Sequence, residues 1–187
     1  MAPILGIYAS QISGHLTPPN SYASIATQTV GSGGASSITF SSIPSTYTHL
    51  QIRILSKTTS GDFNDLTLTA NADSGANYSW HRIYGNGATV STNAVTSTTP
   101  MTVGLDTGST QASGVFATNV IDVLDYTSVN KNKTFRTMAG ADANGSGYII
   151  LFSGTWYNSS TAVTSITLTP AGGAFTQYSS FALYGIR

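Results

Sequence analysis

The sequence predicts an all-β fold, an antiparallel β-sandwich of the jelly-roll type. Runs rich in β-branched and aromatic residues alternate with a period of two and are separated by Gly, Asn and Pro. The composition disfavours helices, because Glu does not occur and Lys and Arg together number only 7. About eight to ten strands, spaced by roughly 8 to 15 residues, suit two packed sheets.

The expected strands follow one another between short loops from residue 22 onward. In one of them, Leu50, Ile52 and Ile54 face one side of the strand, while Gln51 and Arg53 face the other. The strands cover residues 22–30, 37–41, 48–58, 66–72, 78–84, 101–105, 115–126, 134–141, 148–157, 162–169 and 175–186. Residues 88–99 are rich in Thr, Ser and Asn, and we expect a long loop or a weak edge strand there.

Two segments carry more specific expectations. Residues 115–126 are apolar at both parities around Ile121 and Val123, which is typical of a central strand covered on both faces. Residues 142–147 (DANGSG) match the first half of a calcium loop, but Ser153 stands where that loop needs a bidentate Glu. Asn-Gly between two strands is typical of a hairpin, so we expect a turn.

The charge balance excludes several classes of protein. Of 187 residues only 7% are charged, and 7 Lys and Arg balance 7 Asp, so no basic field exists to attract nucleic acid. The 26 Ser and 28 Thr give a polar but uncharged surface. A net charge near zero lowers colloidal solubility, which favours a subunit of a larger assembly over a concentrated free monomer.

The sequence predicts neither a cysteine-based crosslink nor a membrane-spanning helix. It contains no Cys, so neither a disulfide nor a Cys-ligated zinc site can form. Apolar stretches such as residues 148–152 are far shorter than the roughly 20 residues of a membrane helix. The opening residues MAPILGIY do not resemble a signal peptide, so we expect a protein made and assembled inside a cell, with no membrane partner.

Two parts of the chain differ in pattern: an N-terminal arm, residues 1–20, and a sandwich domain, residues 21–187. The arm is too short for a domain and too apolar for a free tail. It forms either a first strand of its own sandwich or a contact with a neighbouring subunit. The side chains expected to make that contact are Ile4, Leu5, Ile7, Tyr8, Ile12 and Leu16.

Catalytic and metal sites find little support in the sequence. The histidines lie more than thirty residues apart and form no H-x-x-x-H or H-x-H pair: His15, His49 and His81. The close carboxylate pairs are Asp62 with Asp65 and Asp122 with Asp125, and positions 122 and 125 face opposite sides of a regular strand. No G-x-S-x-G motif occurs. We therefore expect no enzymatic activity, no cofactor and no metal.

One aromatic cluster has two interpretations. Tyr78, Trp80, His81 and Tyr84 could form a platform on which the apolar faces of sugars stack. The alternative is that these rings fill the sandwich core or a subunit interface, which is the commoner use of large aromatic side chains.

Seven stretches spread over nearly the whole chain carry a resemblance. They are residues 4–15 (ILGIYASQISGH), 21–27 (SYASIAT), 40–53 (FSSIPSTYTHLQIR), 81–87 (HRIYGNG), 121–126 (IDVLDY), 165–169 (SITLT) and 179–186 (SSFALYGI). In these stretches the chain resembles small virion proteins of tailed bacteriophages, which are labelled head decoration or cement, head fibre or tail fibre proteins. The resemblance implies a jelly-roll subunit without enzymatic activity, a homotrimer, attached to a phage particle.

The resemblance leaves two functions open. In the first, the protein is a capsid cement on the virion surface that binds the major capsid protein and stabilises the assembled shell. In the second, it is a fibre module that recognises host surface glycans through the aromatic cluster. A fibre usually carries an extended shaft ahead of its tip, so a chain with about twenty residues before the sandwich favours the cement.

Overall fold

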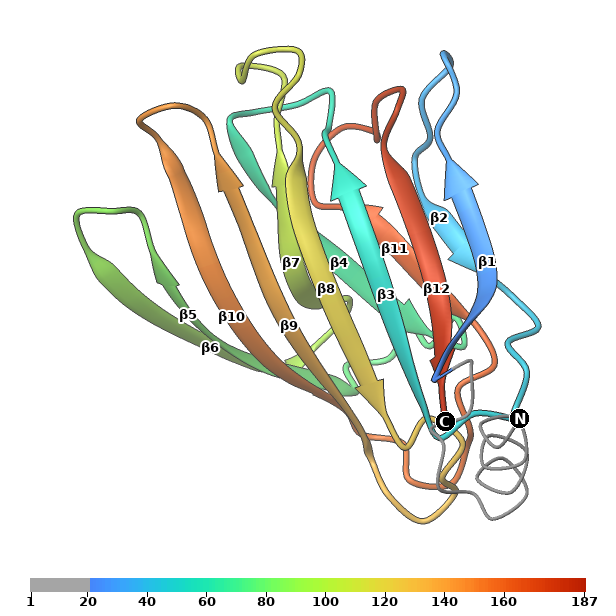
Figure 1. The fold of residues 1–187 in the computed structure, drawn as a ribbon. Helices are drawn as coiled ribbons and strands as arrows, with labels where there is room; N and C mark the ends of the chain where they lie inside the picture. The colour runs from blue at the N-terminus through green and yellow to red at the C-terminus, as the bar shows by residue number, and fades with distance from the viewer. Residues whose placement is uncertain (1–20) are drawn as a thin grey trace, which may run out of the picture.

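The computed structural model describes residues 21–187 and consists of two antiparallel β-sheets packed face to face (Figure 1). The large sheet has eight strands in the order β1 (Tyr22–Thr29), β12 (Ser180–Ile186), β3 (His49–Ser56), β8 (Ala117–Leu124), β9 (Lys133–Asp142), β10 (Gly147–Trp156), β5 (Tyr78–Gly85) and β6 (Val90–Thr98). The small sheet has four strands in the order β2 (Ile38–Phe40), β11 (Ile166–Pro170), β4 (Phe63–Ala70) and β7 (Met101–Thr107).

The predicted β-sandwich is confirmed. The chain passes from one sheet to the other at eight of its eleven connections, as is typical of a jelly roll, and stays within the large sheet at the β5–β6, β8–β9 and β9–β10 hairpins. The described residues form twelve strands, more than the eight to ten expected. No helix in residues 21–187 is long and apolar enough to span a membrane.

The core lies between the sheets and follows the predicted alternation. Leu50, Ile52 and Ile54 of β3 are at most 3% exposed and face the small sheet. From the opposite layer, Leu66 and Leu68 of β4 are fully buried. Alternate residues of the long strands therefore supply one continuous apolar layer, which accounts for the stability of a fold that has no disulfide.

Two details of the sequence prediction need correction or refinement. Residues 90–98 form a strand, β6, at the edge of the large sheet, which selects the second of the two alternatives stated for this segment. β8 is a central strand as expected, but the described residues cover only one of its faces. Its outward side chains, such as Val120 and Leu124, are only half-buried, because the small sheet packs on the opposite face.

The outer edge of the small sheet is closed by a side chain of the large sheet. Among the strands β7 pairs only with β4, yet all seven of its residues are buried. At its end Thr107 also forms a bridge with Lys57 and accepts a hydrogen bond from the Thr58 N–H at 2.7 Å. Asn119 of β8 donates from Nδ2 to the Leu105 carbonyl oxygen at 2.8 Å and accepts from the Leu105 N–H at 2.9 Å. Gly104 leaves room for this amide, because a Cβ there would overlap its Oδ1. At Leu105 the amide thus takes the place of a neighbouring strand.

Two buried ammonium groups fasten loops to the sandwich. Lys57 Nζ donates to the carbonyl oxygens of Gly108, Gln111 and Ala112 at 2.8–3.0 Å. Lys133 Nζ donates to the carbonyl oxygens of Lys131 and Asn158, both at 2.8 Å, in contact with the Trp156 ring. Burial lowers the pKa of both lysines because desolvation disfavours the charged form.

Candidate interaction surface

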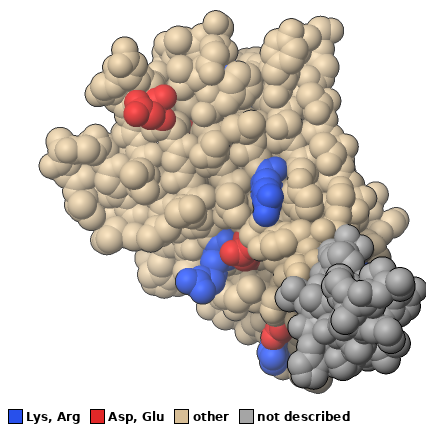
Figure 2. Space-filling view, viewed as in Figure 1, with Lys and Arg blue, Asp and Glu red and all other residues tan. Residues whose placement is uncertain are grey.

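The outward face of the large sheet is the main candidate for a functional surface. Figure 1 views the molecule from this side, with the small sheet behind the large one. The same view in space-filling form shows few charged side chains, some of them in adjacent pairs of opposite sign, on an otherwise uncharged surface (Figure 2). Within residues 21–187 no second layer covers this face, so its side chains are available to a partner.

An apolar band crosses four strands of this face. Val120 of β8, Met138 of β9, Leu151 of β10 and Ile83 of β5 are direct cross-strand partners, so their side chains stand in one row. Met138 is 62% exposed, Leu151 50% and Ile83 47%. The row ends at Thr92 of the edge strand β6. We call these four apolar residues the apolar band.

A second apolar position stands beside the band. Ile149 of β10 is 72% exposed and has Gly140 of β9 and Gly85 of β5 as its cross-strand partners. Because neither neighbour has a side chain, the surface is hollowed on both sides of Ile149, and a shallow pocket lies there. Exposed apolar side chains that gather on one face, rather than scatter singly, are typical of interaction sites.

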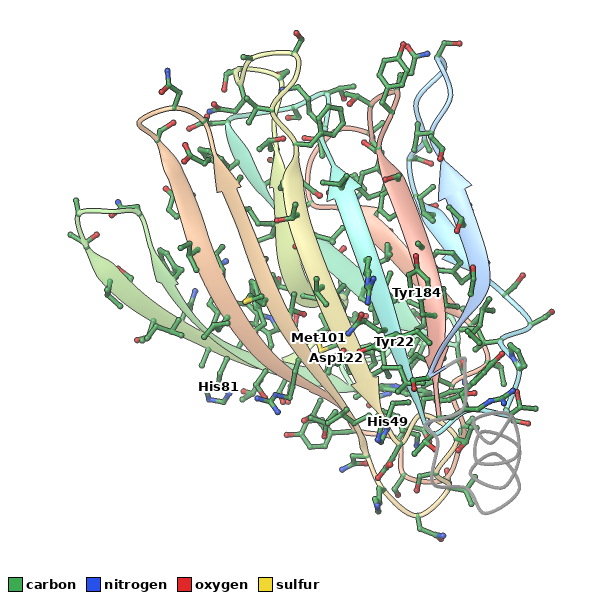
Figure 3. All side chains as sticks on the ribbon, in the orientation of Figure 1. Tyr22, His49, His81, Met101, Asp122 and Tyr184 are labelled. Atoms are coloured by element: carbon green, nitrogen blue, oxygen red, sulfur yellow. The ribbon has the colours of Figure 1, made fainter. Side chains whose placement is uncertain are left out.

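A polar row runs parallel to the band. It contains Gln51, Asp122, Arg136, Ser153 and His81, which are cross-strand partners from β3 to β5. Gln51 Nε2 donates to Asp122 Oδ1 at 2.8 Å. Figure 3 shows Asp122 between Tyr184 on one side and His81 on the other, along the breadth of the sheet.

Two arginines of this face lie beside the apolar band. Arg53 is the cross-strand partner of Val120 and is held in place: its Nε donates to Gln51 Oε1 at 2.8 Å, and its guanidinium lies over the rings of Tyr22 and Tyr184. Arg136 makes no ion pair with the described residues, and it lines two shallow hollows together with Leu151. Arg and Met side chains are enriched in protein interfaces, and Arg136 beside Met138 fits that pattern.

The predicted aromatic cluster is divided between the two sides of the sheet. Tyr78 is fully buried and Trp80 is 6% exposed, so both rings lie in the core. Tyr84 is half-buried on the same inner side, next to Tyr148. His81 alone of the set is exposed on the outward face. The four side chains therefore do not form one platform, and the core-packing interpretation describes Tyr78 and Trp80.

The environment of these rings explains their burial. Trp80 packs edge-on against Phe152 with centroids 6.2 Å apart, and the Arg82 guanidinium lies 5.3 Å from its ring. Arg82 Nη1 also donates to Asp65 Oδ1 of the small sheet at 2.8 Å, which ties the two layers together. Tyr78 donates its hydroxyl to the Ala70 carbonyl oxygen, and burial raises the pKa of Tyr78 to about 12.

The remaining residues singled out from the sequence either make local hydrogen bonds within the fold or lie outside the described residues. The arm side chains Ile4, Leu5, Ile7, Tyr8, Ile12 and Leu16 lie outside residues 21–187. His49 Nδ1 accepts a hydrogen bond from the Asp125 N–H at 2.9 Å. Asp142 begins the turn between β9 and β10, where its Oδ1 accepts from the Asn144 N–H, so the predicted turn is confirmed. Residues 21–187 contain no group of three or more His, Asp or Glu that could hold a metal ion.

One buried carboxyl group was not singled out by the sequence. Asp106 of β7 is fully buried between the sheets, where Ser56 donates a hydrogen bond to its Oδ1 and its Oδ2 has no partner. Burial raises the pKa of Asp106 to about 7, the Ser56 hydrogen bond opposes this shift, and the charge of Asp65 adds to it. This group makes the folded state sensitive to pH.

The apolar band was not recognised from the sequence, although a signal for it exists. β10 is apolar at both parities from Tyr148 to Phe152, so a strand with one core-facing side must expose the alternate side chains Ile149 and Leu151.

A comparison with protein-family models, with curated proteins and with solved structures finds no match to this chain.

Proposed function

We propose that this protein is a structural subunit that attaches to a protein shell, specifically a capsid decoration or cement protein of a bacteriophage, as the sequence resemblance suggests. The observation that carries the proposal is the apolar band on the uncovered face of the large sheet. A monomer in water would leave Met138, Leu151 and Ile83 solvated, whereas a shell protein docked on this face would bury them.

The mechanism follows from mass action. A subunit that binds only the assembled shell lowers the free energy of that shell relative to its dissociated or expanded forms. The nearly uncharged face makes such binding depend on apolar contact and hydrogen bonding, with Arg53 and Arg136 as cations beside the band. Repetition over a particle lets modest affinity at each site produce a large total effect. Self-association as a homotrimer, implied by the resemblance, would raise the avidity further.

The side-chain environments favour binding over catalysis. Asp65 binds Arg82, and Asp122 accepts a hydrogen bond from Gln51, so each has a structural partner. Asp62 accepts hydrogen bonds from Thr110 and Gln111. Glycan recognition by a fibre protein is the alternative function. The burial of Tyr78 and Trp80 removes the rings on which that alternative depended.

Imaging of virions that contain this chain, by cryo-electron microscopy, tests the proposed location. Density for the sandwich over the capsid lattice, with the large sheet facing the shell, would support the proposal. Density on tail fibres alone would contradict it and would make host glycans the next ligand to test.

A variant tests whether the apolar band makes the contact. Leu151→Ser should weaken binding of the purified protein to undecorated capsids about tenfold or more, because it removes a half-exposed apolar group from the band. Val129→Ser is the matched control, since Val129 is 55% exposed in the loop after β8 and lies outside the band. Equal binding by both variants in a capsid co-sedimentation assay would contradict attachment through the band.

Deletion of residues 2–19 tests the predicted arm. We expect the shortened protein to stay folded and β-rich, as measured by circular dichroism, and to lose capsid binding. If the deletion abolishes folding, the segment belongs to the sandwich of its own chain.

A further inference from the structure

The strand β6 is an open edge of the large sheet. It pairs with β5 on one side, and no described strand lies on its other side. Its sequence, VSTNAVTST, contains neither a charge nor a proline, and most of its side chains are exposed. Native proteins usually protect such edges with lysine, proline or a covering segment, because an edge strand is a template for another strand.

The register of the β5–β6 hairpin indicates which backbone groups of β6 point toward β5 and which point to its open side. The Asn86 N–H donates to the Thr89 carbonyl oxygen at 3.2 Å and closes the β5–β6 turn. Hydrogen-bonded and non-hydrogen-bonded pairs alternate from there, so Ser91 and Asn93 direct their backbone groups toward β5. Val90, Thr92 and Ala94 direct their N–H and C=O groups away from β5, toward the open side. There the Ala94 N–H donates to Asn93 Oδ1 of its own strand at 2.7 Å, a bond that pairing with another strand would replace.

The other edges in the described residues are protected in different ways. Asn119 closes β7. β2 has only three residues. β1 is interrupted by a bulge between Ser24 and Ala26. β6 instead keeps a regular register from Val90 to Val95. Of these four edges, β6 is therefore the best suited to accept another strand.

We propose that β6 pairs with β6 of a second copy of this chain, antiparallel, about a two-fold axis that passes through Thr92 perpendicular to the sheet. In this register Thr92 lies opposite Thr92 of the second copy, and Val90 lies opposite Ala94. Each outward residue then exchanges both backbone hydrogen bonds with its partner, so the outward N–H and C=O groups of all three residues are satisfied. Moving the axis by one residue leaves one of the three without a matching partner.

The side chains agree with this register. On the outward face Thr92 meets Thr92 and Val90 meets Ala94, and on the inner face Ser91 meets Asn93. Thr–Thr pairs are favourable across antiparallel strands, and no like charges oppose each other. The protein as a whole has a net charge of zero, so two copies do not repel each other over longer distances.

The register also joins the apolar bands of the two copies. Thr92 ends the row that contains Val120, Met138, Leu151 and Ile83. A two-fold axis through Thr92 therefore places the band of the second copy in line with that of the first, on the same face of a continuous sheet. The inference does not depend on capsid binding, which can fail while the pairing remains.

The oligomeric state of the full chain tests the proposal. Sedimentation velocity of the wild-type protein should show an assembly with an even number of chains: a dimer, or a hexamer where a three-fold contact also forms. Thr92→Lys places two ammonium groups opposite each other and should halve the mass, with the pair dissociation constant raised about tenfold or more.

Thr27→Lys is the matched control. Thr27 is exposed on the opposite edge strand β1 and lies in the same cross-sheet row, so it should leave the mass unchanged. If both variants halve the mass, β6 pairs with β1 of the next copy and the two-fold is overturned. A wild-type protein that remains monomeric or purely trimeric at high micromolar concentration also overturns it.

A charge-pair mixture tests the register itself. Thr92→Asp should dissociate the pair as Thr92→Lys does, and an equimolar mixture of the two variants should restore the wild-type mass, because residue 92 opposes its own copy. Circular dichroism confirms that both variants are folded. If the mixture fails to reassociate while both variants remain folded, the axis does not pass through Thr92.

Discussion

The two edge strands β6 and β7 differ in how the backbone groups on their outer side are satisfied. β7 is the outer strand of the small sheet, and all of its residues are buried. The Asn119 amide bonds the Leu105 backbone, and Thr107 pairs with Lys57 and Thr58. β6 is the outer strand of the large sheet, and no described strand pairs with its outward backbone groups, of which the Ala94 N–H donates to Asn93 Oδ1. The difference shows that the position of a strand in a sheet does not decide whether it can recruit a partner. A side chain from the other sheet can satisfy backbone groups of an edge strand, as Asn119 does for Leu105 of β7.

The largest expected effect concerns the core beneath the open edge. Trp80 lies on β5 opposite Val95 of β6 and packs against Phe152 and Arg82. Trp80→Ala should lower the free energy of unfolding by about 3–5 kcal/mol, because it removes a large buried ring and leaves a cavity. Urea denaturation measures the loss. Retained stability combined with lost binding to host glycans would instead support the receptor interpretation of the aromatic cluster.

The next effect concerns the closed edge and its pH dependence. The folded state raises the pKa of Asp106 from its ordinary 3.8 to about 7, so it binds this proton more tightly than the unfolded chain does. Stability should therefore be highest below about pH 4 and should fall as the pH rises to about 7, by up to about 4 kcal/mol from this group.

Asp106→Asn isolates that contribution. The variant should lack the part of the slope between pH 4 and 7 that Asp106 produces, and it should be more stable than the wild type at pH 8. Urea denaturation across this range gives the slope. Parallel curves for the two proteins would show that the Asp106 carboxyl does not titrate in this way.

A smaller effect should follow from opening the closed edge. Asn119→Ala leaves the Leu105 N–H and C=O without partners in a buried position, which costs about 2–3 kcal/mol. Thermal unfolding and hydrogen exchange at Leu105 measure the effect. Faster exchange confined to β7 would show that the edge has opened locally, whereas unchanged exchange would contradict the role assigned to the Asn119 amide.

The smallest effect is expected at the open edge. Thr92→Lys should change the free energy of unfolding of the dissociated chain by no more than about 0.5 kcal/mol, because the side chain is exposed. Denaturation at low protein concentration provides this measurement. A loss comparable to that of Asn119→Ala would mean that β6 carries structure within its own subunit, and the contrast between the edges would disappear.

Most of the fold could be predicted from the sequence because the boundaries between most strands are clear. Gly, Asn and Pro separate the strands, so the expected segments 48–58, 134–141 and 148–157 contain or closely match β3, β9 and β10. β6 was ambiguous for a physical reason. Thr, Ser and Asn give it no buried side, so the alternation of apolar and polar residues that identifies a strand is absent.

The candidate surface was harder to predict because it depends on register and on packing. Parity alone places Tyr78, Trp80 and Tyr84 on one side of a strand and His81 on the other, but it does not say which side is buried. The apolar band joins residues from four strands, and only the observed pairing puts Met138 beside Leu151. The contact between Asn119 and Leu105 joins the two layers and has no signal in the local sequence.

The two buried lysines have a consequence for how the loops respond to proteases. Each ammonium group is held by backbone carbonyl oxygens of loop residues, so releasing a loop would strand a charge in a dry environment. The loop at residues 108–112 is therefore fastened from within, although several of its side chains are exposed. Because the chain contains no cysteine, these lysine hydrogen bonds hold the loops where a disulfide would otherwise do so. Protease cleavage should therefore concentrate in loops that no lysine side chain holds.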